Sequence, residues 1–184
     1  MEEKALAIWN LMRAFDTLES LPRSGYAMRG VRPAESVAAH GFSTVLLAML
    51  LADAEGGADV EKVLRMAVLH EAGETRLTDI PRTARRFFQP GEVDRAERGA
   101  AFEVLKDADG ADRYRALFEE YQTCATREAR LVRAADKLQM LCKVRIYEQG
   151  GAKNLDDFFE NDQGMDLEPF PAARALYQLL RSMK

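Results

Sequence analysis

Apolar residues recur at intervals of three and four along most of this chain, and no segment alternates apolar and polar residues as a half-buried strand does. Near the start, the repeat falls on Ala5, Ile8, Leu11 and Phe15, which gives one apolar side to a helix. The pattern therefore predicts an all-α protein. No internal repeat, low-complexity tract or linker divides the chain, so we expect residues 1–184 to form a single-domain irregular helical bundle.

Local start and stop residues predict the helix boundaries. Ser36 and Asp59 have side chains suited to N-caps, and the glycine pairs 56–57 and 150–151 are typical helix stops. The second helix is apolar nearly all round, so we expect it to be central and buried. The third is expected to run to about residue 76, because Pro81 disfavours continuation. The expected helices cover about 5–15, 37–54, 60–76, 83–88, 92–106, 114–121, 126–149 and 172–182, with a loop over 21–35.

Composition limits the partners. A net charge of -4 and a pI near 5.4 give no long-range attraction to nucleic acid or to an anionic membrane. No apolar run approaches the roughly 20 residues that cross a bilayer, so no membrane partner is expected. The two cysteines, Cys124 and Cys142, lack metal-ligand spacing and the density of a disulfide scaffold. Reduced thiols in a cytoplasmic protein are the simpler interpretation.

The candidate functional residues are two histidines and their acidic neighbours. His40 and His70 are the only histidines of the chain, each in apolar sequence, and Glu71 directly follows the second. Asp136 falls among small and apolar residues of a predicted helix, where a carboxylate must be paired or bind a metal. Imidazole nitrogens and carboxylate oxygens suit divalent ions such as Zn, Mn, Fe, Co or Ni. Together these residues are candidates for one metal site.

The residues alone leave other interpretations open. A single histidine on an apolar helix is more often a hydrogen-bonded core residue than a ligand. Asp136 could equally be the ion-pair partner of Arg133. The run from His70 to Glu74 also resembles part of the His-Glu-x-x-His motif of zinc metalloproteases, although it lacks the second histidine. A protease would leave His40 without a role.

Three segments carry a specific resemblance: LPRSGYAMRGVRPAESVAAH, AVLHEAGETRLTDIP and FEEYQTCATREARLVRAADKLQM. They resemble HD-domain metal-dependent phosphohydrolases, most closely the 5'-deoxynucleotidase subgroup, over nearly the whole chain. The resemblance implies one divalent metal ion (Mn, Co, Zn, Ni, Fe or Mg) ligated by His40, His70, Glu71 and Asp136. It further implies a nucleoside 5'-monophosphate substrate, hydrolysed to nucleoside and phosphate by an activated water, and a homodimer.

The same resemblance assigns the remaining site residues. Glu74 is implied as the acid that activates the attacking water, and Asp79 as an acid that protonates the leaving oxygen. Residues four apart share a helix face, so Glu74 is expected beside the ligand His70. Arg23 resembles the arginine that grips the 5'-phosphate, which a guanidinium fork can bind bidentately. Tyr26 stands where close relatives carry tryptophan near the sugar.

Two positions depart from the family pattern. Glu71 replaces the aspartate of the histidine–aspartate pair and is one methylene longer, so it must bend or shift the helix to reach an ion. Ala39 replaces an acid that would complete a capping box with Ser36. The Glu71 departure keeps a second hypothesis open: a catalytically weakened protein that binds metal and nucleotide for regulation.

Overall fold

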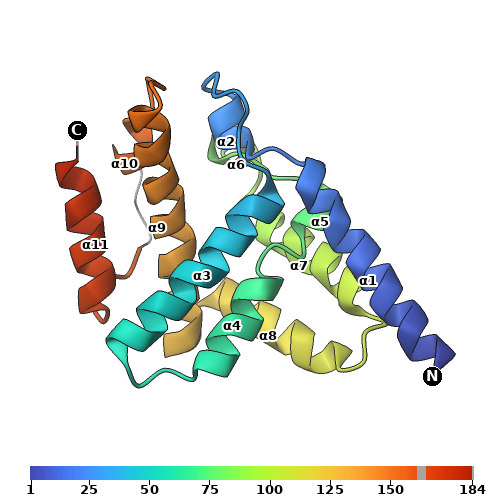
Figure 1. Cartoon of the computed structure of the whole chain (residues 1–184). Coiled ribbons are helices and arrows are strands. Elements are labelled where there is room, and N and C mark those ends of the chain that lie inside the picture. Colours follow the sequence, from blue (N-terminus) through green and yellow to red (C-terminus); the bar gives the residue numbers. More distant parts are fainter. Residues whose placement is uncertain (161–164, 184) are drawn as a thin grey trace.

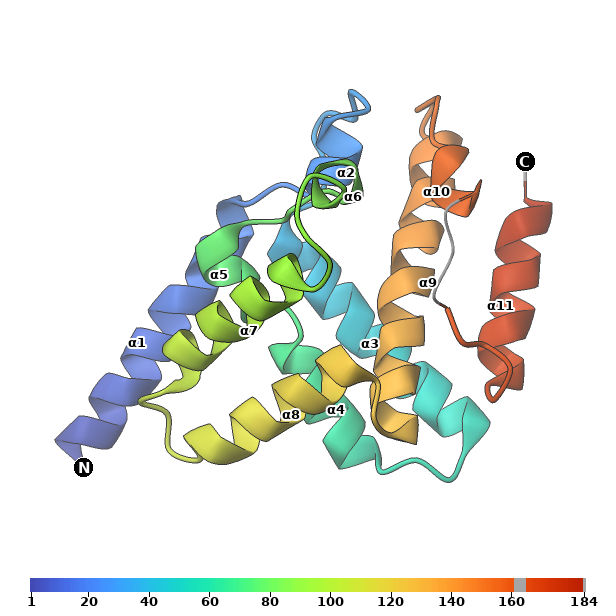
Figure 2. The same cartoon turned by 180° about the vertical axis from the view of Figure 1, so that it is seen from behind.

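The computed structural model describes residues 1–160 and 165–183, and it confirms the all-α prediction. Within those residues the only extended pairing is one isolated bridge between Pro22 and Ser36. Helices α3, α4 and α9 form the centre, with α1, α7 and α8 on one side and α11 on the other (Figures 1 and 2). The helices are α1 Glu2–Ser20, α2 Ser24–Ala27, α3 Val37–Glu55, α4 Val60–Leu69, α5 Glu74–Leu77, α6 Arg82–Arg85, α7 Glu92–Leu105, α8 Ala111–Thr123, α9 Arg127–Gln149, α10 Asp157–Glu160 and α11 Pro171–Ser182.

Side-chain N-caps start the three central helices, and the sequence predicts two of these caps. Ser36 accepts a hydrogen bond from the Ala39 backbone N–H at α3, and Asp59 accepts one from the Lys62 N–H at α4. Thr126 caps α9 in the same way. The buried faces of these helices meet in one apolar core, which includes Val63, Met66, Leu131, Leu138 and Leu141. The core fixes the helices that carry the candidate site residues.

The third helix ends earlier than predicted, and this changes the setting of the candidate site. Helix α4 stops at Leu69, residues 70–73 form a tight turn, and a separate short helix α5 begins at Glu74. In the turn, Ala72 donates to the Leu69 carbonyl and Glu74 donates to the Glu71 carbonyl, each three residues back. The prediction that His70 and Glu74 share one helix face is therefore wrong.

Short helices account for the other differences. The expected loop over 21–35 contains α2, and α10 lies in a segment for which no helix is predicted. The helix expected over 83–88 is α6, which ends at Arg85. Each of these helices has only four residues, too few to produce a repeating pattern in sequence.

Helix α3 is central but not buried all round. His40 and Thr44 on its inner face are buried, whereas Phe42, Leu46 and Leu50 are exposed, so the expectation of a wholly buried helix is wrong. By length and composition alone, α3 could cross a bilayer, contrary to the expectation of no such run. The core helix of a globular bundle satisfies the same criterion, and α3 packs along α4 and α9 here.

Candidate metal centre and its cavity

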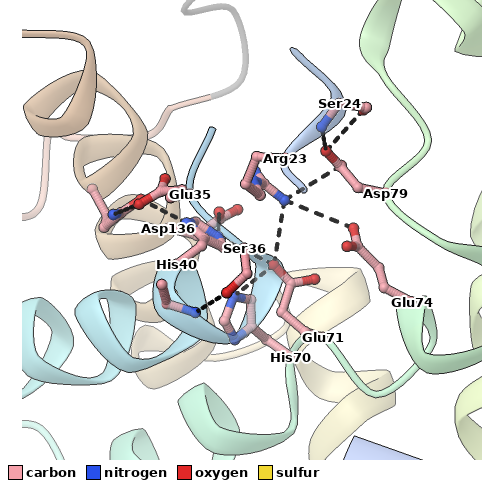
Figure 3. A network of polar contacts seen from close by, with 12 residues as sticks. Arg23, Ser24, Glu35, Ser36, His40, His70, Glu71, Glu74, Asp79 and Asp136 are labelled. Carbon is pink, nitrogen blue, oxygen red and sulfur yellow. Dashed lines mark hydrogen bonds and ion pairs between the residues drawn. The ribbon is translucent and has the colours of Figure 1, made fainter. Parts of the chain in front are cut away.

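Two buried imidazoles face each other where α3 meets the end of α4. His40 comes from the first turns of α3 and His70 directly follows α4, with ring centroids 5.6 Å apart (Figure 3). The Nδ1 atom of His70 lies 2.6 Å from the Ala67 carbonyl oxygen, which can only accept, so this nitrogen carries the proton. The Nδ1 atom of His40 lies 2.6 Å from Oε1 of Gln139. Both rings therefore direct Nε2 into the space between them.

Two carboxylates meet these nitrogens. Oε1 of Glu71 lies 3.1 Å from Nε2 of His40 and 3.3 Å from Nε2 of His70. Oδ1 of Asp136, on α9, lies 3.2 Å from Nε2 of His40. One ligand atom each from His40, His70 and Glu71 lies within 4.8 Å of the others. The structure thus brings all four candidate ligands together, three in one compact group and Asp136 against His40.

This arrangement fits a divalent cation. Nε2 of both histidines is buried and has no hydrogen-bond partner in the described part of the chain. An unpaired buried nitrogen costs free energy unless a ligand satisfies it. Imidazole nitrogens with carboxylate oxygens form a donor set that borderline divalent ions accept. A ligating imidazole usually has its other nitrogen held by a hydrogen bond, as both rings do here.

The electrostatics of the cluster also favour a cation at its centre. Burial, and then Arg23, oppose a charge on His40, but the adjacent carboxylates of Asp136 and Glu71 outweigh them and raise the pKa of His40 to about 9. Burial opposes ionisation of Glu71, but the two histidines hold its pKa well below the usual range. For Asp136, Lys137 and His40 overcome burial and lower the pKa. In the metal-free protein, a proton on His40 supplies the positive charge between these acids.

Arg23 links the cluster to a second group of acids. Its Nη1 atom lies 3.5 Å from Glu71, 3.9 Å from Glu74 and 3.3 Å from Asp79 (Figure 3). Asp79 also accepts hydrogen bonds from the Ser24 backbone N–H at 2.6 Å and the Ser24 hydroxyl at 2.8 Å. Asp79 therefore fixes the loop between α1 and α2 and orients the Arg23 guanidinium beside the candidate ligands.

Glu74 opens α5 on the far side of Arg23. Burial first, and then the charge of Glu71, raise the pKa of Glu74 to about 10, against the opposing effect of Arg23. Its Oε2 atom is buried without a hydrogen-bond partner among the residues described. A cation bound beside Glu71 would offset the negative charge and favour the ionised form of Glu74. The carboxyl group is thus placed to exchange a proton in the cavity.

Three of the four candidate ligands, all except His40, line one cavity of about 740 Å³ together with Arg23, Glu74 and Asp79. Tyr26 forms part of its wall, with the ring against Tyr147 and Phe158 and the hydroxyl donating to the Met140 carbonyl at 2.9 Å. Further lining residues are basic, including Arg82, Arg86, Arg133 and Lys137. The cavity therefore combines the acidic cluster with positively charged groups, as an anionic ligand bound at a cation requires.

The structure shows which residues pair with Asp136 and how Glu71 reaches the histidines. Asp136 pairs with His40 and Lys137, whereas the guanidinium of Arg133 lies 4.2 Å above the Tyr121 ring. The alternative Asp136–Arg133 ion pair does not occur among the described residues. Glu71 lies in the 70–73 turn after α4, and there one of its oxygens contacts both imidazoles, so no helix has to bend for it to reach them.

Sequence reasoning missed the residues that surround the ligands. Gln139 holds His40, Glu35 holds Gln139, and the Tyr121 hydroxyl donates to Oδ2 of Asp136 at 3.3 Å. Gln139 lies three residues after Asp136 and so on the same face of α9, which is a signal that the sequence does contain. Nothing local in the sequence indicates Glu35 or Tyr121.

A helical bundle whose buried histidine–acid cluster borders a cavity has the architecture of a helical protein with a metal centre. The HD domain family model matches residues 15–172, and this chain belongs to that family. Membership of the family implies a divalent metal at the cluster.

Similar proteins agree with this assignment. The 5'-deoxynucleotidase hdd1 of Schizosaccharomyces pombe is 29% identical over 163 residues, covering 84% of this chain and 80% of its own. A conserved hypothetical protein of Pyrococcus furiosus is 34% identical, with a TM-score of 0.75 over 94% of this chain and 96% of its own. A predicted metal-dependent phosphohydrolase of Magnetospirillum magnetotacticum, 24% identical, shares the fold with a TM-score of 0.71 over 98% of this chain and 94% of its own.

Proposed function

We propose that this protein is a metal-dependent phosphomonoesterase that hydrolyses nucleoside 5'-monophosphates, deoxy forms among them, to nucleoside and phosphate. The observation that carries the proposal is the pair of buried Nε2 atoms without hydrogen-bond partners: both meet Glu71, that of His40 also meets Asp136, and Glu71, Asp136 and His70 line the cavity. Similar proteins that are named 5'-deoxynucleotidases support the substrate class. Local positive charge from Arg23 supports an anionic substrate in a chain whose net charge is -4.

In this proposal His40, His70, Glu71 and Asp136 hold one divalent cation. Such an ion supplies a lowered pKa for water and charge stabilisation at a phosphoryl oxygen. The fold brings the four side chains together, because His40 and Asp136 come from core helices and His70 and Glu71 come from the turn after α4. The identity of the ion, among Mn, Co, Zn, Ni, Fe and Mg, is a matter for metal analysis.

The remaining residues act on the substrate. Glu74 accepts a proton from the attacking water, and its unpartnered Oε2 in the cavity supports that role. Arg23 binds the 5'-phosphate, since its fork already lies beside the cluster and Asp79 orients it. Asp79 delivers a proton to the leaving 5'-oxygen, while the Tyr26 ring lies beside the sugar. The cavity that these residues line supports both placements.

A second candidate function is binding without turnover, and Glu71 favours it, because the glutamate replaces the aspartate of the resembled pattern. A panel of ribo- and deoxyribonucleoside 5'-monophosphates, assayed for released phosphate with Mn, Co, Ni, Zn and Mg, separates the two. Hydrolysis of at least one monophosphate, abolished in Glu74→Gln but with metal still bound, supports the enzyme. Stoichiometric metal with no phosphate release under any ion would leave the binding function.

We further propose that two copies of this chain associate through α1 and the outer face of α3. Support comes from exposed apolar side chains: Trp9 is 61% exposed and Phe42 73% exposed, with Ile8, Met12, Leu46 and Leu50 also exposed. Helices α1 and α3 pack against each other, and exposed apolar side chains on neighbouring helices often mark protein interfaces. Analytical ultracentrifugation should show a dimer that Leu46→Glu dissociates, and a wild-type monomer at micromolar concentration would refute the proposal.

We also propose a cytoplasmic location. Cys124 and Cys142 are both free thiols, which agrees with a reducing compartment. Fractionation of the cells that express the protein, with thiol labelling, tests this proposal.

A further inference from the structure

A buried chain of polar contacts lies behind His40, on the side away from the cavity. Oε1 of Gln139 lies 2.6 Å from Nδ1 of His40, and Nε2 of Gln139 donates to Oε2 of Glu35 at 3.4 Å. Nζ of Lys143 lies 3.4 Å from the same Glu35 oxygen. Glu35, His40 and Gln139 are all buried (Figure 3 shows Glu35 beside His40). The chain thus runs from a partly exposed lysine to the imidazole of a candidate ligand.

The chemistry of the partners fixes which atoms donate. A carboxylate can only accept, so the Gln139 amide must direct its NH₂ group toward Glu35 and its oxygen toward His40. The amide oxygen then accepts from Nδ1–H of His40, so Nε2 faces Glu71 and Asp136 and is the nitrogen that loses its proton when His40 binds a metal ion. The reversed amide would place an NH₂ group against an imidazole N–H and an oxygen against a carboxylate. Glu35 therefore selects the orientation of Gln139, and Gln139 selects the tautomer of His40.

Burying this series of polar side chains costs free energy. A glutamate and a glutamine are buried, and Oε1 of Glu35 has no hydrogen-bond partner within the described residues. Helix α9 buries leucines at other positions, among them Leu131, Leu138 and Leu141, so the helix itself does not require an amide at 139. Packing of α9 alone does not call for a buried amide here.

We propose that Gln139 and Glu35 are positioning residues that hold His40 ready to bind a metal ion through Nε2. The inference rests on the metal centre of the proposed function and extends it to two residues outside the cavity. His70 needs no such side chain, because the Ala67 carbonyl holds its Nδ1. Removing the partner that orients a metal-binding histidine typically weakens metal binding by roughly 10- to 100-fold.

The test compares Zn²⁺ affinity, measured by chelator competition, in four proteins. Gln139→Leu removes the acceptor and should weaken Zn²⁺ binding by roughly 10- to 100-fold. Gln149→Leu makes the same change at the exposed end of α9 and should leave the affinity at the wild-type value. The exchange Glu35→Gln with Gln139→Glu keeps one carboxylate and one amide in contact and gives His40 a carboxylate acceptor. Its affinity should return toward the wild-type value.

A second readout does not depend on affinity. In the Zn²⁺-loaded protein, NMR of ¹⁵N-labelled histidine should give a protected Nδ1–H signal from each of the two rings. Gln139→Leu should remove protection at His40 and leave it at His70, and the exchanged pair should restore it. Where Gln139→Leu fails to fold, the exchanged pair and Glu35→Gln alone carry the same comparison. Unchanged Zn²⁺ affinity and an unchanged His40 Nδ1–H signal in Gln139→Leu and in Glu35→Gln would overturn the proposal.

A failure of the positioning role can be distinguished from a failure of the proposed function. Wild-type protein that binds Zn²⁺ but releases no phosphate refutes the enzyme and still permits both readouts. Wild-type protein that turns over substrate, with Gln139→Leu binding Zn²⁺ equally well, refutes only the positioning role. Wild-type protein without stoichiometric Zn²⁺ refutes the metal centre and this inference together.

Discussion

Nη1 of Arg23 lies 3.9 Å from Oε1 of Glu74, while Oε2 of the same glutamate is buried without a hydrogen-bond partner in the described chain. The arginine therefore compensates only part of the cost of burying Glu74. Burial, followed by the charge of Glu71, raises the pKa of this carboxyl to about 10. A buried carboxyl group whose charge is only partly compensated should destabilise the metal-free protein.

Glu74→Gln should stabilise the metal-free protein increasingly as the pH rises. The pKa of the Glu74 carboxyl is about 10 in the folded protein, against an ordinary value of 4.5 in the unfolded chain, so between these values the folded state holds a proton that the unfolded state lacks. The wild-type free energy of unfolding therefore falls as pH rises through this window, by up to about 1.4 kcal/mol per pH unit. Thermal unfolding at pH 5 and pH 8 measures the effect; an equal difference in Tm at both values would contradict it.

Arg23→Lys should weaken substrate binding more than metal binding. A lysine ammonium lacks the planar fork that binds two phosphate oxygens. Loss of one charged hydrogen bond, worth about 1.5 kcal/mol or more, corresponds to a rise in KM of roughly tenfold or more. Steady-state kinetics with one nucleoside monophosphate and metal analysis of the same sample check this. An unchanged KM would mean that Arg23 serves only to pair the acids around it.

The parts of the fold that were predictable depend on local interactions. The caps at Ser36 and Asp59 are set by bonds to N–H groups three residues away, so the sequence alone predicts them. The end of α4 at Leu69 is different, because the following turn packs its Gly73 against the backbone of Glu97 in α7. That contact joins segments distant in sequence, and no local pattern encodes it.

The candidate site, like the fold, is only partly predictable from the sequence. The residue types at His40, His70, Glu71 and Asp136 pointed to a metal site, and the structure brings them together, but their mutual placement came from a resemblance rather than from spacing. The helix-face argument for Glu74 fails, yet the turn and α5 still bring this residue to the cavity. Glu35 and Tyr121, which contact Gln139 and Asp136, are recognisable only from the contacts of the folded chain.

Glu71→Asp should retain or raise phosphate release, because aspartate is the residue of the resembled family pattern. The shorter side chain must still reach Nε2 of both histidines, which Glu71 contacts at 3.1 and 3.3 Å. The comparison is made at saturating metal, with His70→Ala as a control that should lose bound metal. Complete loss of activity with metal retained would mean that the turn over 70–73 has adapted to glutamate.

Gly73→Ala should destabilise the protein and weaken metal binding together. A Cβ at this position would lie 2.8 Å from the Glu97 carbonyl oxygen and 3.2 Å from its Cα, and both are backbone atoms that cannot rotate away. Forced overpacking of this kind costs about 1–3 kcal/mol. To relieve it, the turn that carries His70 and Glu71 must move away from α7.

Gly99→Ala is the matched control, since Gly99 lies on the exposed side of α7 and a Cβ there meets nothing within 4 Å. Replacing a helical glycine with alanine should stabilise the protein by about 1 kcal/mol or less. Chemical denaturation and Zn²⁺ affinity of both variants test whether the turn couples helix packing to the metal centre. Gly73→Ala with reduced stability but wild-type Zn²⁺ affinity would show that α4 and the turn absorb the added methyl group without moving the ligands.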